Sequence, residues 1–279
     1  MPECRCDASR SDPGLLHSIV WFEFPFMHRF YLPPEHCAGP GFALTGREAH
    51  HALHVLRLRR QERILVLDGA GNERVCEVLE CGRHEVQLRV VEKNSTPALP
   101  CHITLLQAVP KGKTIESIIQ KATELGVRRV VPVLSERTTL RLDRESAAQK
   151  TAKWQLVAIE AIKQCGSPWL PIVEAPVTPE EFLRRRERFE LPLVASLQPG
   201  SRQAREYFQT FHTQHGRPPR AACVWVGPEG DFTPAEVTAI QAAGGLPITL
   251  GRLVLRCETA AVFCLSILNY ELQSVSAEE

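Results

Sequence analysis

The chain has 279 residues, of which 44% are hydrophobic and 23% are charged, and its 33 Lys and Arg residues nearly balance 32 Asp and Glu residues. This composition is typical of a folded globular protein and excludes disordered, collagen-like and coiled-coil chains. A chain of this length most often folds into about two domains. The net charge of +1 argues against a protein coated in basic residues, although it leaves room for a local basic patch.

The ten cysteines are scattered and form no CxxC pair, so the sequence does not support a zinc ribbon or a thioredoxin-like motif. Several of them lie within apolar runs, where a reduced thiol behaves as a small hydrophobic side chain. No apolar run approaches the roughly 18 residues that a membrane-spanning helix needs. We therefore expect a cytoplasmic protein with no membrane partner.

The first 26 residues differ from the rest of the chain. A polar, turn-rich segment precedes an apolar one, Leu15–Phe26, which His17 and Glu23 interrupt. This region lacks the continuous apolar stretch and the small-residue cleavage site of a signal peptide. We expect residues 1–26 to be an extension that is either not translated, with Met27 as the first residue, or disordered.

Short strands and tight turns are predicted between residue 27 and residue 93. Runs rich in β-forming residues lie at 55–58, 63–67, 74–79 and 85–91, with turn-rich segments between the later ones. Closely spaced strands of this kind favour a small barrel or sandwich. Residues 94–100 contain two prolines and read as a linker. We therefore expect one domain at residues 27–97 and a second at residues 98–279.

After the linker, near-continuous apolar strands alternate with amphipathic helices. Two helices are predicted at 114–125 and 147–165, each followed by a glycine, and two more after the last two strands. This alternation predicts an α/β fold with a mostly parallel sheet that helices cover on both faces. The expected strands are at residues 103–109, 130–134, 193–197, 222–226 and 246–250.

Two short motifs in the chain are weak signals. Gly112-Lys113-Thr114 looks like the end of a P-loop, but Gln107 stands where the first glycine of that loop is required. His50 and His54 have the spacing of a zinc pair on a helix, but no third ligand is evident. No GxGxxG follows a strand, which argues against a dinucleotide-binding fold. We therefore expect no metal site.

The most informative segment is 224–236. An apolar strand runs directly into a loop with Gly227 and Gly230, and a helix with a capping box begins at residue 233. Such glycines let the backbone approach a ligand closely at the carboxyl end of a strand, where open α/β sheets bind ligands. A second loop of this kind follows the next strand and includes Arg256 and Glu258. An arginine at a helix start opposes the helix dipole, so packing or function should account for it.

These two loops, GPEGDFT at Gly227–Thr233 and LGRLVLRCETA at Leu250–Ala260, closely resemble those of the RsmE-type ribosomal-RNA uridine-N3 methyltransferases of the SPOUT superfamily. The resemblance extends from residue 27 to about residue 272. Further segments that match in order are MHRFYLP (27–33), HHALHVLRL (50–58), KGKTIESIIQKATELGV (111–127), SER (135–137) and EAIKQCG (160–166).

The chain departs from the family's pattern at a few positions. Asp231 stands where a second glycine is common, and Lys163 replaces a common glutamate. Ser167-Pro168 follow where an arginine is often found, and Gln61-Glu62 replace a Gly-Asp pair. The changes near residue 163 bear on local RNA or dimer contacts, and not on the cofactor loops.

The resemblance implies a PUA-like β-barrel that helps to hold RNA, followed by a SPOUT domain with a C-terminal trefoil knot. It also implies a homodimer, S-adenosylmethionine as the methyl donor, and 16S ribosomal RNA in the small ribosomal subunit as the partner. Carried over by position, the residues expected to bind the cofactor are Leu197, Gly227, Pro228, Glu229, Gly230, Leu250, Gly251, Leu255, Arg256, Thr259 and Ala260.

Methylation of uracil at N3 requires loss of the N3 proton, so the site needs a base, a cation that stabilises the anion, or both. Arg256 fits the cationic role because a guanidinium stays charged. Arg29 is a second catalytic candidate through contact with the base. Glu229 and Glu258 are the nearest carboxylates, and Glu258 is retained as a catalytic candidate although neither is identified as the base.

Basic residues are concentrated between residue 107 and residue 165, where eleven Lys and Arg residues face six acidic ones. Because RNA is bound largely through its phosphates, we expect this segment and the N-terminal domain to hold it. The target uridine must be unpaired or flipped out of its helix. The residues expected to contact RNA are Arg29, Arg57, Lys111, Lys113 and Arg137.

Three functions remain open from the sequence. The first is an S-adenosylmethionine-dependent methyltransferase of uridine N3 in ribosomal RNA. The second is an RNA-binding module that has lost activity, which the intact cofactor loops speak against. The third is a SPOUT methyltransferase with another target, such as transfer RNA, which the full-length match speaks against.

Overall fold

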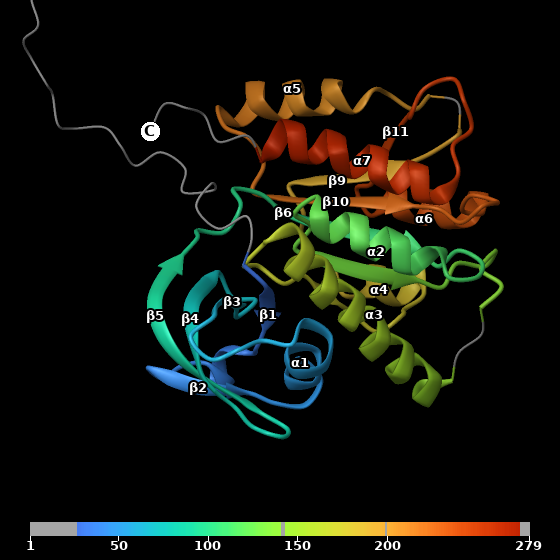
Figure 1. Ribbon diagram of the computed structural model, residues 1–279. Coiled ribbons are helices and arrows are strands. Elements are labelled where there is room, and N and C mark those ends of the chain that lie inside the picture. Colours follow the sequence, from blue (N-terminus) through green and yellow to red (C-terminus); the bar gives the residue numbers. More distant parts are fainter. Residues whose placement is uncertain (1–26, 141–142, 199, 274–279) are drawn as a thin grey trace, which may run out of the picture.

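A computed structural model of the chain describes residues 27–140, 143–198 and 200–273, which form two lobes with one β-sheet each (Figure 1). The predicted extension, residues 1–26, lies outside the described residues. We call residues 27–95 the N-terminal lobe and residues 101–273 the C-terminal lobe. The elements of the N-terminal lobe are β1 (Arg29–Tyr31), η1 (Pro34–His36), β2 (Gly41–Leu44), α1 (Gly46–His50), η2 (His51–Leu56), β3 (Arg63–Leu67), β4 (Asn72–Cys81) and β5 (Val86–Ser95).

The N-terminal sheet has the strand order β1-β3-β4-β5-β2, and all its pairs are antiparallel except β1 with β3. Two register shifts interrupt the pairing of β4 with β5, and such bulges bend a sheet. The strands curve around a separate core that includes Phe30, Ile64 and Leu88 (Figure 1). This arrangement is the small β-rich unit that the short strands predicted.

The strand predicted at residues 55–58 is wrong. Residues 51–56 form η2, a π-helix that continues α1 and ends where Arg57 takes a left-handed conformation with φ of 55°. Ala49 and Ala52 are fully buried and let this helix pack closely on the sheet, whereas Val55 is 62% exposed. Packing of the small residues therefore outweighs the β-propensity of the sequence around Val55.

The C-terminal lobe is built on a six-stranded sheet with the order β11-β9-β10-β6-β7-β8, and every pair is parallel. The predicted parallel α/β fold is confirmed. The elements are β6 (His102–Ala108), α2 (Thr114–Glu124), β7 (Arg129–Val133), α3 (Arg144–Cys165), β8 (Ile172–Val173), α4 (Pro179–Arg184), β9 (Leu191–Ala195), α5 (Ala204–His215), β10 (Ala221–Val226), α6 (Pro234–Ala242), β11 (Leu246–Ile248) and α7 (Cys257–Leu272).

Helices cover both faces of this sheet. On β6, Ile103 and Leu105 pack with residues of α2, α3, α5 and α7, while Leu106 and Ala108 pack with residues of α4 and α6. The alternation follows from the pleat, which points successive side chains to opposite faces. No helix of the described residues is long and apolar enough to cross a bilayer.

The core around β6 gives a prediction about stability. Leu105 is fully buried, so Leu105→Ala removes apolar contacts and leaves a cavity, and we expect it to lower the free energy of unfolding by about 2–5 kcal/mol. Leu156 on α3 is 42% exposed, and Leu156→Ala should cost about 1 kcal/mol or less. Urea unfolding followed by circular dichroism measures both values. Equal losses in the two variants would contradict the assignment of Leu105 to the core.

Candidate functional site

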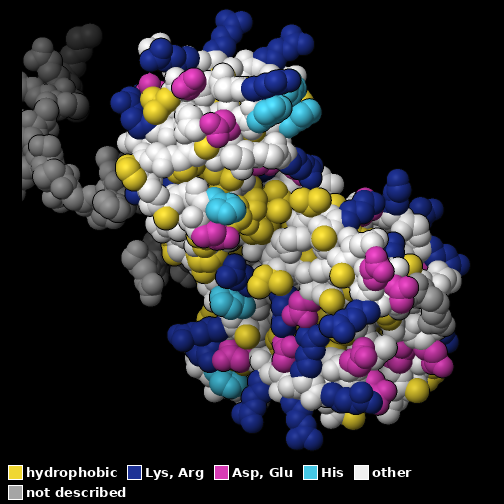
Figure 2. All heavy atoms as spheres, turned by 90° about the horizontal axis from the view of Figure 1, so that it is seen from below, with side chains coloured by type: hydrophobic (Ala, Val, Ile, Leu, Met, Phe, Trp, Pro, Cys, Tyr) yellow, Lys and Arg dark blue, Asp and Glu magenta, His cyan; other side chains and the backbone are white. Residues whose placement is uncertain are grey.

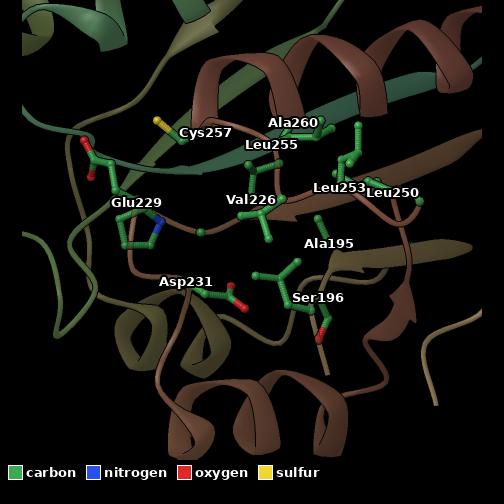
Figure 3. A pocket seen from close by; sticks show the side chains of 15 residues that line it. Ala195, Ser196, Val226, Glu229, Asp231, Leu250, Leu253, Leu255, Cys257 and Ala260 are labelled. Atoms are coloured by element: carbon green, nitrogen blue, oxygen red, sulfur yellow. The ribbon is translucent and has the colours of Figure 1, made fainter. Parts of the chain in front are cut away.

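An open cavity lies at the carboxyl ends of β9 and β10 and beside the chain that leaves β11 (Figure 3). This edge of an open α/β sheet is where ligands bind. Three chain segments supply its walls. The lining residues are Ala195, Ser196, Leu197, Val226, Gly227, Pro228, Glu229, Asp231, Leu250, Gly251, Leu253, Val254, Leu255, Cys257 and Ala260.

Most of the residues expected to bind a cofactor line this cavity. Gly230 and Arg256 lie in the same loops and Thr259 in the first turn of α7, but none of the three lines the cavity. The predicted residues that do are Leu197, Gly227, Pro228, Glu229, Leu250, Gly251, Leu255 and Ala260. Further residues line the cavity that were not predicted individually, and their signal is a position at a strand end or beside a predicted residue in the same segment: Ala195, Ser196, Val226, Asp231, Leu253, Val254 and Cys257.

The loop after β10 folds back tightly on itself at Gly227. A Cβ atom at this position would lie 2.7 Å from Asp231 Oδ1 and 3.1 Å from the Phe232 nitrogen, so only glycine fits without a shift. Asp231 has a φ of 60°, a left-handed conformation that asparagine, aspartate and glycine tolerate best. Its Oδ1 accepts a hydrogen bond from Phe232 N at 2.8 Å, which stabilises the turn. Aspartate is thus a workable substitute for the glycine common there.

The loop after β11 brings apolar side chains to the mouth of the cavity (Figure 3). Gly251 has a φ of 108°, which favours glycine, and its nitrogen donates to Thr249 Oγ1 at 3.2 Å. Leu253 and Val254 are each 78% exposed, and Leu197, which lines the cavity after β9, is 63% exposed. Three large aliphatic side chains exposed around one cavity are typical of an interaction surface.

Hydrogen bonds tie the loops after β6 and β7 to the loop after β10. Glu229 Oε1 accepts from Lys111 N at 3.0 Å, and the Arg137 guanidinium donates to the Gly230 carbonyl. Two predicted RNA contacts, Lys111 and Arg137, therefore lie at the rim of the cavity. Lys113, two residues after Lys111, is the N-cap residue of α2. The Glu229 carboxylate holds the loops together, a role that competes with one as a general base.

Arg256 precedes α7 as its N-cap residue and lies between two residues that line the cavity, Leu255 and Cys257. It is exposed and makes no side-chain capping bond. In the part of the chain that the structure describes, its guanidinium has no hydrogen-bond or ion-pair partner. Arg256 is therefore a free cation at the edge of the cavity.

Cys257 and Glu258 interact at the first turn of α7. The Cys257 thiol donates to Glu258 Oε2 at 3.3 Å. Burial of the thiol and the adjacent carboxylate raise the pKa of Cys257 to about 12, so the thiol stays protonated at neutral pH. Since the thiolate is the nucleophilic form, Cys257 is not a nucleophile under these conditions.

The structure does not bring Arg29 or Arg57 to the cavity. Arg29 donates to the carbonyls of Lys163 and Gln164 at 3.5 and 3.2 Å, at the end of α3. Arg57 is exposed at the turn that ends η2.

Figure 2 shows Lys and Arg side chains spread over both lobes of one face, with acidic side chains among them. Within the described residues, no three His, Cys, Asp or Glu side chains form a cluster that could hold a metal ion.

Two family descriptions match this chain. A family described as an RNA methyltransferase domain matches residues 97–269, and one described as an RNA methyltransferase PUA domain matches residues 44–91. Two relatives are both named ribosomal RNA small subunit methyltransferase E. The relative from Bacillus subtilis is 30% identical over 86% of this chain and 94% of its own length. The relative from Synechocystis is 32% identical over 90% of this chain and 80% of its own length.

Two solved structures resemble the whole described fold. One, from Legionella pneumophila, is in complex with the bound cofactor S-adenosyl methionine, with a TM-score of 0.79 and 30% identity over 88% of this chain and 98% of that chain. The other is a ribosomal RNA small subunit methyltransferase E from Neisseria gonorrhoeae bound to S-adenosyl methionine. Its TM-score is 0.76, with 30% identity over the same shares of the two chains.

The raised pKa of Cys257 predicts slow alkylation. At pH 8 a thiol with a pKa of about 12 is ionised in only about one molecule in ten thousand, and its reaction rate should rise about tenfold per pH unit up to pH 12. The exposed thiol of Cys81 should react with iodoacetamide more than about tenfold faster at pH 8. Peptide mass spectrometry over time measures both rates. Rapid labelling of Cys257 at pH 8 would contradict the assignment.

Proposed function

The chain belongs to the ribosomal RNA small subunit methyltransferase E family, and from that premise we propose that it methylates N3 of one uridine in 16S ribosomal RNA, with S-adenosylmethionine as the methyl donor. The observation that carries the proposal is the cavity at the carboxyl edge of the sheet, where eight residues of the expected cofactor loops meet beside a free arginine. The similar structures from Legionella pneumophila and Neisseria gonorrhoeae, which contain S-adenosyl methionine, support the choice of cofactor.

The lining of the cavity fits this cofactor. Nothing lies within 4 Å of the Cβ position of Gly251, so a ligand can approach the backbone of this loop directly. Gly227 instead lets the loop after β10 close on itself. Val226, Leu250 and Leu255 offer apolar contacts for an adenine ring. The carboxylates of Glu229 and Asp231 complement the positive charge of the ligand. When bound, S-adenosylmethionine supplies a methyl group on a positively charged sulfur atom.

The protein's own residues must hold the uridine and stabilise the charge that develops on it. The free guanidinium of Arg256 would donate hydrogen bonds to the uracil anion, a form of electrostatic stabilisation. Lys111, Lys113 and Arg137 at the rim of the cavity would bind phosphates next to the target nucleotide. Glu258, two residues after Arg256 in the first turn of α7, stays a catalytic candidate without an assigned role as the base. Arg29 would act on the RNA only indirectly, through the junction of the lobes.

The architecture belongs to the same proposal. We assign a PUA-like RNA-binding barrel to residues 27–97 and a SPOUT domain to residues 98–279. The family matches at 44–91 and 97–269 support this division. A trefoil knot in the chain after β9 is supported by the strand order, in which β9 separates β10 from β11. The eight free cysteines of the described residues support a reducing compartment, the cytoplasm.

Two measurements test the function. Isothermal titration calorimetry of the purified chain with S-adenosylmethionine should detect binding, and its absence would favour the inactive RNA-binding module. Mass spectrometry of 16S ribosomal RNA from a strain that lacks the gene should show the loss of one uridine-N3 methyl group. If every such methyl group survives while a transfer RNA loses one, the target is transfer RNA and the proposed substrate is wrong.

Arg256 gives a direct prediction about catalysis. Arg256→Ala should lower kcat by roughly 10²–10³-fold, because it removes a donor aimed at developing charge. The melting temperature and the affinity for S-adenosylmethionine should stay close to those of the unaltered protein. Arg205→Ala is a matched control, since Arg205 is an exposed arginine on α5, away from the cavity. A methylation rate for Arg256→Ala equal to that of the control would remove Arg256 from the site.

A homodimer is the last part of the proposal. The exposed Leu197, Leu253 and Val254 around the cavity support it, because a second subunit would cover them. Val254→Asp should therefore convert a dimer into a monomer, measured by size-exclusion chromatography with light scattering. Ile172 is 58% exposed on β8, and Ile172→Asp should leave the dimer intact. A Val254→Asp protein that stays dimeric would show that this surface is not the interface.

A further inference from the structure

A cluster of charged side chains joins the two lobes. Lys163, near the end of α3, places its Nζ 3.0 Å from Glu48 Oε1 of α1 and 3.1 Å from Glu160 Oε1. The side chains of Lys163 and Glu48 are only 7% and 12% exposed. Arg47 of α1 completes the cluster, 3.1 Å from Glu160 Oε1. Two cations and two carboxylates therefore balance one another across the junction.

Backbone groups fix both ends of this cluster. The second oxygen of Glu48, Oε2, accepts from Tyr31 N at 3.3 Å, which attaches α1 to β1. From β1, Arg29 donates to the carbonyls of Lys163 and Gln164, which are free because α3 ends there. Gly166 ends the helix with a φ of 81°, and a Cβ atom at this residue would lie 3.2 Å from the Arg29 guanidinium. The N-terminal lobe is thus fastened to the last turn of one helix.

Backbone pairing and apolar contacts also join the lobes. Gly71 N donates to the Pro168 carbonyl and Leu170 N to the Gly69 carbonyl, each at 3.0 Å, which fixes one side of the junction. Leu65, Leu67 and Val75 of the N-terminal sheet pack with Ile162 of α3. Hydrophobic contact is non-directional and tolerates sliding and rotation. A buried ion pair is weak evidence for stability, since the loss of hydration offsets the attraction, but removing one partner leaves an uncompensated charge. The backbone pairing holds the junction at residues 168–170, and the charged cluster adds a second directional contact at α1, which limits rotation of the N-terminal lobe about that pairing.

We propose that Lys163 is a positioning residue: its buried pair with Glu48 holds the N-terminal lobe at one orientation on α3, so that RNA bound to that lobe meets the cavity in register. This use of the junction rests on the proposed function. The orientation itself does not, because it depends only on contacts within the chain. Positional errors of about 1 Å can reduce a rate about 10²-fold, so a mobile lobe would be costly.

The first test measures orientation without any reaction. Double electron–electron resonance spectroscopy measures the distance between two nitroxide labels, one on each lobe. The labels are attached at Arg83→Cys, in the turn between β4 and β5, and at Ala148→Cys, on α3. Serine replaces Cys4 and Cys6, which lie outside the described residues, and Cys81 and Cys165, which are not buried. In this background, Lys163→Met should broaden the distance distribution, and Lys163→Arg should keep it narrow. A distribution unchanged by Lys163→Met would overturn the proposal, whatever the activity of the protein.

The second test measures the reaction of the full chain. Glu48→Gln and Lys163→Met should each lower kcat/KM for ribosomal RNA by about 10–100-fold, with the affinity for S-adenosylmethionine unchanged. The double variant should lose little more than either single variant, since one interaction is removed. Glu180→Gln, in an exposed ion pair with Arg184, is the matched control and should change nothing.

The outcomes of the two tests separate the proposals. If Lys163→Met broadens the distance distribution and no variant, nor the unaltered chain, methylates RNA, the orientation is correct and the proposed function fails. If methylation is normal in all variants, Lys163 is not a positioning residue. If Lys163→Met does not fold, the distance and activity measurements are made on Glu48→Gln and on the double variant Glu48→Gln/Lys163→Met instead. Neither of these leaves the buried Glu48 carboxylate opposite an apolar side chain.

Discussion

The parallel pairing of β9, β10 and β11 is the constraint on which the cavity depends. Because these strands run in the same direction, the loops that leave them emerge at one edge of the sheet. Gly227 allows a tight loop after β10, and Gly251 allows a left-handed conformation after β11, so that the three loop segments together line one cavity. The loops after β6 and β7 join the same edge through Lys111 and Arg137. Residues far apart in the sequence thus meet at one edge of the sheet.

Much of this arrangement could be predicted from the sequence, because it depends on local patterns. Apolar periodicity locates the strands and helices of the C-terminal lobe, and glycines next to strand ends identify the two main loops. What periodicity cannot supply is contact between distant residues. Ala195 and Ser196 line the cavity only because β9 lies beside β10, and Arg29 lies at the end of α3 only because the lobes pack there.

The strand predicted at residues 55–58 shows that a local sequence pattern can also give the wrong element. The β-forming residues at 55–58 predict a strand, but α1 and η2 bury Ala49 and Ala52 against the N-terminal core. Packing of these two helices on the sheet outweighs the local strand preference. Lys163 and Asp231, two departures from the family's pattern, each have a local explanation. Lys163 finds a buried carboxylate in Glu48, and Asp231 accepts the positive φ that its turn requires.

The strand order also determines when the sheet can close during synthesis. β10 lies between β9 and β6, yet residues 221–226 are made after both neighbours. Until then, β6 presents an unpaired edge of buried, apolar residues, the kind of edge that pairs with other chains. Pairing over more than a hundred residues is also slow, because closing a long loop precedes any gain from contact. The N-terminal lobe can fold while the chain is still growing, whereas the central strand of the larger sheet is inserted late, and that delay is the period in which the nascent chain is most exposed to aggregation.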